Sequence, residues 1–300
     1  MTSSRIGKLV VVGVGLIGGS FALALKRSGA AARVVGVGRS RSNLDTAARR
    51  GIVDVVYTLD AAWTAELADA DLVLVATPVG QMPGLFAAMA GKVGAHTVLT
   101  DAGSTKQDVV AAARASLGAA LPRFVPGHPV AGTEHSGALA AFDGLFRDKQ
   151  VVLTPLAETE PAAVARVSDC WTGCGALVRH LDPLRHDAIF AAVSHLPHAL
   201  AFALVAELAA RPDADACFAF AGSGLRDFTR LASSQPEMWR DVCLANRAAL
   251  RSDLAAYRDE LGRVDALLAA ADGEALLRLF ERARSARAGW LERASGGDEV

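Results

Sequence analysis

The chain has 300 residues, of which 52% are hydrophobic and 21% are charged, and this composition excludes a disordered or fibrous protein. Its length is enough for two domains or for one large α/β unit. The formal net charge is −1 and no block of like charges occurs, so we expect a small-molecule ligand and no nucleic-acid partner.

Cysteine usage and the apolar segments indicate the compartment. The four cysteines form no CxxC pair, so reduced thiols are expected. The first apolar run leads into a glycine turn rather than a cleavage site, which predicts a strand and not a signal peptide. The apolar stretch at 188–205 contains His195, Pro197 and His198, which argues against a membrane span. We therefore expect a cytoplasmic protein with no membrane partner.

The first part of the chain alternates short β-branched runs with helical stretches, a pattern typical of βαβ units and a doubly wound, mainly parallel sheet. Several of these runs are continuously apolar, as expected for strands that are covered on both faces. The expected strands are residues 9–12, 33–37, 72–76, 97–100, 123–125, 151–153 and 176–181.

After residue 182 the strand pattern ends, and apolar residues recur at three- and four-residue spacing. We predict a dinucleotide-binding (Rossmann) domain at 1–182 and an all-helical substrate-binding domain at 183–300. Helix breaks are expected at 222–224 and 233–236. The alanine-rich faces of the helical part favour a homodimer.

A glycine-rich turn, GVGLIG, follows the first expected strand and opens a helix. Gly13 allows the tight turn, Gly15 lets the backbone approach a pyrophosphate, and Gly18 permits close contact between helix and strand. The helix N-terminus at Leu16 and Ile17 attracts the anion. The alternative is a glycine turn with a purely structural role.

The second expected strand ends without an acidic residue. In NAD-binding domains of this kind a carboxylate there holds the ribose hydroxyls, but here Gly38 is followed by Arg39, Ser40 and Arg41. These residues leave room for a 2′-phosphate and supply cations to meet it, so NADP is favoured. The alternative is that the arginines are simply solvated and that NAD is accepted as well.

Two further segments lie where parallel strands are expected to end. Thr77 and Pro78 lie at the expected ligand crevice of a doubly wound fold. Ser104, in the segment DAGSTK, either caps the following helix or directs its hydroxyl toward the reacting centre.

His128 follows the expected strand at 123–125 and is flanked by Gly127 and Pro129. A histidine at this place lies near the nicotinamide end of the crevice and titrates near neutrality, so it is a candidate base. If it is that base it must be neutral, and kcat/KM is expected to fall as the pH drops through roughly 6.5. The alternative is a hydrogen-bonded bystander.

His195 and His198 lie three residues apart in a helix expected to begin near Asp187, so they share a face. Pro197 frees the carbonyl of Val193 and is expected to kink this helix. The histidines are either site residues or satisfied core residues. Metal ligation is disfavoured because no carboxylate or cysteine stands at complementary spacing.

Arg226 and Arg230 lie four residues apart after a glycine break, a spacing that suits bidentate capture of a carboxylate. Surface salt bridging is the alternative. Trp239 and Asn246 are expected to serve helix packing and the surface rather than a site.

Five blocks of sequence, taken together, resemble the prephenate dehydrogenase family, including its arogenate and dual-substrate (cyclohexadienyl) members. The resemblance runs from about residue 8 to about residue 279. The blocks are GVGLIGGS, DAGSTK, GHPVAGTE, VSHLPHA and GLRDFTR.

The resemblance implies an oxidative decarboxylation. Hydride leaves C4 of the cyclohexadiene ring for the nicotinamide, a base takes the 4-hydroxyl proton, and the ring carboxylate departs as carbon dioxide. Aromatisation drives the reaction, so the protein has mainly to align the reacting groups.

The resemblance also implies roles for individual residues. His128 is the implied base, and Ser104 contacts the same hydroxyl and orients the imidazole. Arg230 binds a substrate carboxylate, with Arg226 less secure, and His198 faces the pyruvyl side chain. The implied wall beside the base consists of Thr133 and Glu134.

Two rival functions are weaker. Hydroxyacid dehydrogenases of similar build generally use a lysine base in the helical domain, and no lysine occurs in residues 182–300. A non-catalytic dinucleotide sensor would need neither a base nor a carboxylate clamp. The sequence does not separate prephenate from arogenate, but His198 offers a donor to a pyruvyl carboxylate and favours prephenate.

Overall fold

The computed structural model describes residues 5–133 and 135–295. By packing, the chain forms two compact units, one that ends at Leu250 and one that begins at Arg251. The domain boundary expected near residue 182 lies within the first unit and stays a prediction.

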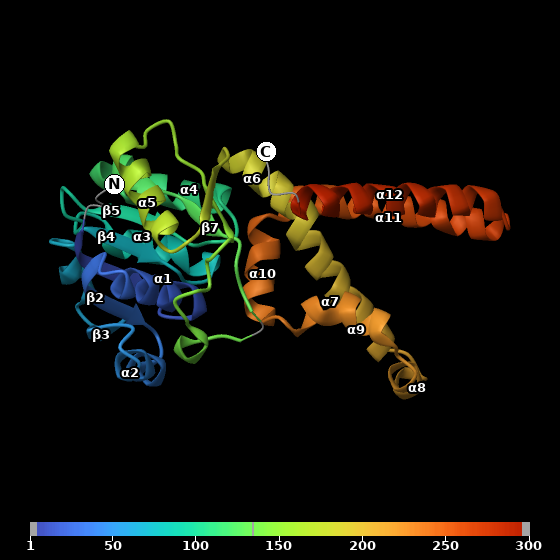
Figure 1. The fold of residues 1–300 in the computed structure, drawn as a ribbon, viewed down its shortest axis with the longest axis horizontal. Helices are drawn as coiled ribbons and strands as arrows, with labels where there is room; N and C mark the ends of the chain where they lie inside the picture. Colours follow the sequence, from blue (N-terminus) through green and yellow to red (C-terminus); the bar gives the residue numbers. More distant parts are fainter. Residues whose placement is uncertain (1–4, 134, 296–300) are drawn as a thin grey trace. The chain divides into compact units, whose positions relative to one another are not determined.

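The first unit is built on a parallel sheet of six strands in the order β3-β2-β1-β4-β5-β6, which is the order of a Rossmann fold (Figure 1). The predicted fold class is therefore confirmed. The strands of this sheet are β1 (Ile6–Val12), β2 (Ala31–Gly38), β3 (Val55–Thr58), β4 (Leu72–Val75), β5 (Val98–Asp101) and β6 (Phe124–Val125).

Helices cover both faces of this sheet, which explains why its strands are apolar without alternation. In β1, Leu9 and Val11 belong to one buried cluster, whereas Val10 and Val12 belong to the other. The first cluster includes side chains of α1 (Leu16–Arg27), α2 (Arg41–Arg49) and α5 (Pro161–Gly173). The second includes side chains of α3 (Met82–Met89) and α4 (Gln107–Ser116).

A second sheet follows the first, and the sequence did not predict it. Its three strands are β7 (Gly127–Pro129), β8 (Gln150–Leu153) and β9 (Leu177–His180). β8 is antiparallel to β7 and parallel to β9. The runs at 151–153 and 176–181 were correctly predicted as strands, but they do not extend the parallel sheet. The sequence does not predict β3 and β7.

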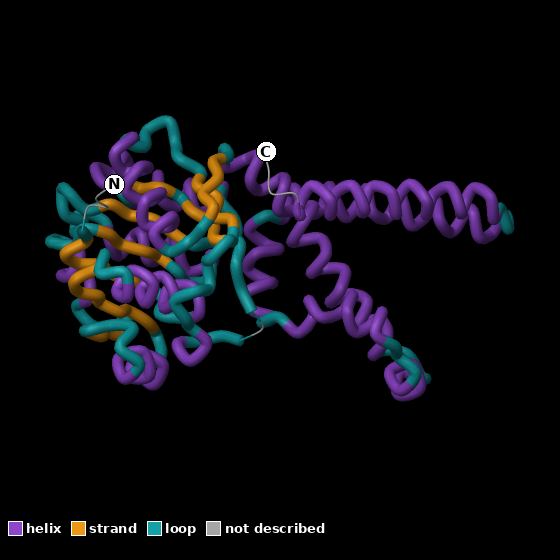
Figure 2. Tube along the Cα trace, in the orientation of Figure 1, coloured by secondary structure: helices purple, strands orange, loops and turns teal. Residues whose placement is uncertain are grey.

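From residue 183 onward, the regular elements of the first unit are all helices in the described residues, as predicted (Figure 2). The breaks expected at 222–224 and 233–236 are confirmed: α9 begins after Gly222, and α10 begins at Pro236. The helices are α6 (Pro183–Phe190), α7 (Leu196–Ala209), α8 (Ala214–Ala219), α9 (Ser223–Thr229) and α10 (Pro236–Ala245).

One π-helical turn, Ala191–His195, joins α6 to α7. Pro197 follows this π turn closely, inside the continuous helix, and lacks the N–H that the helix interior needs, so the expected disturbance of the helix takes the form of this π turn. The helix as a whole begins at Pro183 and not near Asp187, because Asp182 accepts a hydrogen bond from the Arg185 backbone N–H and caps it.

The second unit consists of two long helices joined by a short turn. α11 (Arg247–Ala269) starts in the first unit and continues into the second, and α12 (Gly273–Ser295) follows. Ala271 in the turn has a φ of 51°, the left-handed conformation that ends many helices.

Candidate active site

The turn between β1 and α1 has the geometry that the glycine pattern predicts. Gly13 has a φ of +102°, and a Cβ there would lie 2.4 Å from the Ala76 carbonyl oxygen. A Cβ on Gly18 would lie 2.2 Å from the Gly13 carbonyl oxygen. These two positions therefore require glycine, Gly13 for the turn and Gly18 for the contact between helix and strand.

Gly15 differs from the other two, because a Cβ there would meet no atom within 4 Å. It stands at the N-cap of α1, offers no side-chain cap, and no acidic residue lies in the first turn. The first N–H groups of a helix, here those of Leu16 and Ile17, have no acceptor within the helix. The open space and these donors fit a dinucleotide phosphate.

Thr77 and Pro78 follow β4 beside this turn. The Thr77 hydroxyl oxygen is buried without a hydrogen-bond partner in the described residues, and its Cγ2 would lie 3.0 Å from a Cβ on Gly13. Pro78 starts a short 3₁₀ turn, Val79–Gln81. An unpaired buried hydroxyl next to the glycine turn is a polar group that a bound dinucleotide can satisfy.

The loop after β2 carries the predicted cationic residues in an exposed position. The Ser40 hydroxyl accepts a hydrogen bond from the Asn43 backbone N–H at 3.3 Å and caps α2, so it has a structural role. Arg41 pairs with Asp45 at 2.9 Å. Arg39 is exposed and makes no ion pair within residues 5–133 and 135–295. Arg39 is thus the cation most available to a ligand.

His128 lies on β7 itself, in register with Val152 of β8, rather than in a loop after a strand. A buried ion pair fixes the residue before it. Lys106 Nζ contacts Asp101 and donates to the Gly127 carbonyl oxygen at 2.7 Å. Asp101 Oδ1 accepts from the Gly127 N–H at 3.0 Å, so both backbone groups of Gly127 are held.

Two side chains of α6 lie behind the His128 ring. Its Nδ1 lies 2.9 Å from His186 Nε2, and His186 Nδ1 lies 2.8 Å from Asp187 Oδ1. The ring of Phe190 lies 4.6 Å from that of His128, centroid to centroid. The exposed fractions of His128, His186 and Asp187 are 8%, 0% and 1%, so the chain of three side chains is removed from solvent.

Asp187 also caps a helix that lies far from it in the sequence. Its Oδ1 accepts from the Lys106 backbone N–H at 2.8 Å, and its Oδ2 accepts from the Gln107 backbone N–H at 2.9 Å. Of the two alternatives for Ser104, the structure excludes the cap of α4, since a carboxylate already fills that place. Among the described residues no hydrogen bond joins Ser104 to the imidazole, whose Nδ1 has His186 as its partner.

The electrostatics of this group keep the imidazoles neutral and the carboxylate charged. Burial, with His186 and Lys106 nearby, lowers the pKa of His128 well below 6.5. Burial also lowers the pKa of His186, although Asp187 opposes this. For Asp187 burial acts to raise the pKa, but the hydrogen bonds from His186, Gln107 and Lys106 outweigh it and the pKa is lowered.

The lowered pKa of His128 changes the pH dependence expected from the sequence. Since the pKa of His128 lies below the unperturbed histidine value, the acid limb of kcat/KM should lie well below pH 6.5 and not at it.

The two predicted histidines of the long helix have different surroundings. His195 is fully buried, and its Nδ1 lies 3.1 Å from Asn246 Nδ2, which also donates to the Asp187 carbonyl oxygen at 2.7 Å. His198 stacks on Trp239 with ring centroids 3.5 Å apart. Asn246 and Trp239 were predicted to be packing or surface residues, whereas the structure places them against both histidines.

The structure brings Arg230 close to His198. Burial lowers the pKa of His198, the Ser194 carbonyl opposes this, and the positive charge of Arg230 adds to the lowering. Arg230 is exposed and begins a 3₁₀ turn, Arg230–Ser233, directly after α9. Arg226 is exposed on α9, and no described contact joins it to either histidine. Of the predicted pair, Arg230 is therefore the one beside a predicted site residue.

Thr133 and Glu134 follow β7 in a loop. Thr133 is exposed, and its hydroxyl accepts from the His135 backbone N–H at 3.2 Å. Glu134 lies outside the described residues, so its predicted place in the wall beside the base stays a prediction.

Sequence reasoning missed His186 and Asp187, which complete the network around His128. The available signal was the adjacent pair His186 and Asp187 near the start of an apolar helix, because a buried histidine next to a carboxylate often belongs to a functional site. It was missed because the partners, His128 and the α4 N-terminus, lie 58 and about 80 residues away.

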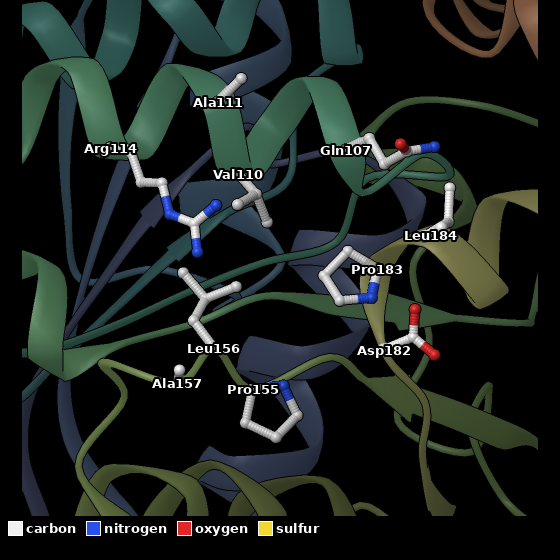
Figure 3. Close-up of a pocket in the computed structure, with 10 residues that line it drawn as sticks. All are labelled: Gln107, Val110, Ala111, Arg114, Pro155, Leu156, Ala157, Asp182, Pro183 and Leu184. Carbon is white, nitrogen blue, oxygen red and sulfur yellow. The ribbon is translucent and has the colours of Figure 1, made fainter.

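An open groove of about 430 Å³ lies beside α4, away from the glycine turn (Figure 3). Apolar side chains form most of its lining, with Arg114 and Asp182 at its edge. Gln107 belongs both to this groove and to the cap around Asp187. The groove contains none of the predicted site residues, so the candidate site is the cluster around His128.

Two family models match the chain. One, for the nucleotide-binding domain of prephenate dehydrogenase, matches residues 21–180, and the other, for the dimerization domain of prephenate dehydrogenase, matches residues 182–282.

Known relatives cover nearly the whole chain. A prephenate dehydrogenase from Bacillus subtilis is 34% identical over 292 residues, which are 96% of this chain and 77% of that protein. A cyclohexadienyl dehydrogenase from Zymomonas mobilis is 33% identical over 93% of this chain and 94% of its own length. The crystal structure of prephenate dehydrogenase from A. aeolicus with hydroxyphenyl propionate and NAD+ superimposes with a TM-score of 0.89, at 33% identity, over 96% of this chain and 99% of that one.

Proposed function

We propose a function from one premise: this chain belongs to the prephenate dehydrogenase family. It is an oxidoreductase that converts prephenate to 4-hydroxyphenylpyruvate by oxidative decarboxylation, with a nicotinamide dinucleotide as cofactor, a step of tyrosine biosynthesis. The arogenate or dual-substrate alternative is not favoured.

The cofactor is held by the residues of the glycine turn. Gly13 and Gly18 shape the turn, and the backbone of Gly15 with the first N–H groups of α1 would meet the phosphates. Thr77 and Pro78 lie at the end of β4 beside this turn. When bound, the dinucleotide supplies the acceptor for the hydride that leaves ring C4.

The protein's own side chains deal with the proton and the carboxylates. His128 accepts the proton of the 4-hydroxyl group, and the resemblance to the family assigns Ser104 as a second contact for that oxygen. Arg230 holds one carboxylate, His198 faces the side chain that carries it, and Thr133 and Glu134 border the base. The ring carboxylate must be free to leave as carbon dioxide, so one arginine that binds the other carboxylate is sufficient.

The observation that carries this proposal is the buried imidazole of His128, which is hydrogen-bonded to His186 and lies on the strand that follows the dinucleotide-binding sheet in the chain. The test is a four-way assay with two substrates, prephenate and arogenate, and two cofactors, NAD+ and NADP+. We expect reduced cofactor and carbon dioxide in equal amounts with prephenate. Cofactor reduction without carbon dioxide would contradict the proposal.

For the cofactor we propose a preference for NADP. Gly38 stands where NAD-binding domains carry a carboxylate, and a Cβ there would lie 3.3 Å from a methyl carbon of Leu44, so any side chain would require a small shift of Leu44. The exposed Arg39 follows at once and suits a 2′-phosphate. The Arg39→Ala variant should lose about tenfold in kcat/KM for NADP+ and little for NAD+. A wild-type protein that strongly prefers NAD+ would contradict this proposal.

For the assembly we propose a homodimer formed through the long apolar helix of residues Pro183–Ala209. Its mean hydropathy over the most apolar window is 1.8, yet only 22% of that window is buried. Length and composition alone would let such a helix cross a membrane, but His195 within it is hydrogen-bonded to Asn246, a poor arrangement for lipid.

A second copy covers such a face without placing the histidines in lipid. Exposed apolar side chains extend the face, with Val193 66% and Phe220 92% exposed. Sedimentation should show a dimer at micromolar concentration, and a monomer would contradict this proposal.

A further inference from the structure

The hydrogen bonds behind His128 determine which of its nitrogens carries a proton. Asp187 is ionised, because its oxygens accept from two backbone N–H groups and can only accept. Its neighbour His186 must therefore carry its proton on Nδ1, which faces Asp187 Oδ1. His186 Nε2 is then an acceptor, so His128 carries its proton on Nδ1, which faces it.

This order leaves His128 Nε2 as the unprotonated nitrogen. A free imidazole can carry its proton on either nitrogen, and a base with the proton on the wrong one cannot accept another there. The chain of Asp187, His186 and His128 excludes the wrong tautomer, much as the carboxylate of a catalytic triad does for a single histidine.

We infer that His186 and Asp187 are positioning residues that fix the tautomer of His128 and share the proton that it accepts. This inference rests on the proposed function, since the proton is that of the substrate 4-hydroxyl. It goes beyond that function because it assigns a role to two side chains behind the base.

The proton balance of the reaction explains why sharing is useful. The substrate loses a hydride and carbon dioxide, and the phenol product carries a hydroxyl proton, so no net proton is released. The base must therefore hold the proton only until the C–CO₂ bond breaks and its electron pair enters the ring. The proton then returns to the phenolate oxygen.

The hydrogen bonds give the held proton a favourable place. When Nε2 of His128 takes the substrate proton, Nδ1 of His128 can pass its own proton to Nε2 of His186. The positive charge then lies on His186, next to the Asp187 carboxylate, instead of on His128. Reversing both transfers returns the proton to the product, so atoms and charges balance.

The other charged and titratable groups nearby do not replace this pair. Lys106 and His195 both act against a positive charge on His128, and Asp101 is already paired with Lys106. Asp187 acts to raise the pKa of His186 through its hydrogen bond and its charge, and Asp101 adds a smaller effect of the same sign. Asp187 is therefore the main group that favours a charge on the imidazole pair.

Two variants separate the parts of this role. In His186→Gln the amide oxygen can still accept from His128 Nδ1, but it cannot take a proton. In Asp187→Asn the counter-charge is lost. We expect each variant to lose about 10²-fold in kcat, with the KM for the dinucleotide within twofold of wild type.

The pH profile is the measurement that a merely structural role would not move. In Asp187→Asn the imidazole pair loses its counter-charge, so the acid limb of kcat/KM should shift to lower pH. His180→Gln, which changes an exposed histidine of β9, is the matched control and should keep wild-type kinetics. A kcat of His186→Gln within threefold of wild type, or an unmoved limb in Asp187→Asn, overturns the inference.

Nitrogen-15 spectra of the histidine rings test the tautomers without substrate. At pH 7 both His128 and His186 should carry their proton on Nδ1, and a proton on Nε2 of either ring overturns the inference. This readout also holds if Asp187→Asn fails to fold, because it uses the wild-type protein.

The two proposals can fail separately. A wild-type protein that oxidises neither prephenate nor arogenate overturns the proposed function and with it the transfer from substrate. An active wild-type protein with Nε2–H tautomers overturns this inference alone.

Discussion

The polar groups around His128 and those around Arg230 are arranged in opposite ways. Around His128, buried side chains and backbone groups hold one another through Asp187, His186 and the Asp101–Lys106 pair. Arg226 and Arg230, by contrast, are exposed, and so is Arg39 in the loop after β2. Within residues 5–133 and 135–295 these three arginines make no ion pair.

This difference separates two physical tasks. A base must be aligned before the substrate arrives, and a buried network does this because each unmade hydrogen bond in it is costly. A cation that binds a carboxylate or phosphate is most useful when it is not already paired, since a paired one must first give up its partner. We therefore expect changes in the first region to alter kcat and stability, and changes in the second to alter KM.

The largest effect is expected for His128→Asn. Asparagine can place an N–H near His186 Nε2 but has no second nitrogen to accept a proton, so kcat should fall by about 10²- to 10⁴-fold. Steady-state kinetics with prephenate measure this loss. Activity within a few-fold of wild type would refute His128 as the base.

Removing one half of the buried ion pair should destabilise the fold. Lys106→Met leaves the fully buried Asp101 carboxylate without its cation and releases the Gly127 carbonyl, at a cost of about 3–5 kcal/mol. Urea unfolding measures it. Arg114→Ala, which breaks the exposed pair with Glu158, is the control and should leave the midpoint near that of wild type.

Local features of both regions could be predicted from the sequence. Gly13 and Gly18 are determined by contacts within one strand-turn-helix unit, so the motif was enough. His128 was found because it is flanked by glycine and proline after a strand, although the strand that carries it, β7, was not predicted. The helix breaks at Gly222 and Pro236 follow from single residues.

Contacts between distant segments could not be predicted in this way. A local rule offers Ser104 as one candidate for the cap of α4, but Asp187, about 80 residues away, fills it. The sequence predicts packing or surface roles for Asn246 and Trp239, because nothing in their spacing points to His195 and His198, which they contact. The chemistry of this site therefore depends on pairings that only the tertiary structure creates.

The buried histidines should also make stability depend on pH. Burial lowers the pKa of His195 to about 4, whereas an unfolded histidine titrates near 6.5. The unfolded chain thus binds more protons between these values, so stability is full above pH 6.5 and falls as the pH drops toward 4.

The loss from His195 alone should be about 2–3 kcal/mol between pH 7 and pH 4.5, and the lowered pKa values of His128 and His186 add to it with the same sign. Urea unfolding at the two pH values measures this loss. His195→Asn should show a smaller difference than wild type. Equal stability of the wild-type protein at both pH values would contradict the burial argument.

Arg230→Ala is expected to change stability least, but to raise the KM for prephenate clearly. Because the guanidinium is exposed and unpaired, its loss should leave the unfolding midpoint unchanged, whereas the KM for prephenate should rise about tenfold or more. The KM for the dinucleotide should stay within twofold. Arg226→Ala is the matched comparison, since Arg226 is equally exposed but no described contact joins it to His198. A larger KM change in Arg226→Ala than in Arg230→Ala would assign the carboxylate contact to Arg226. An unchanged KM in both variants would show that neither arginine binds the carboxylate.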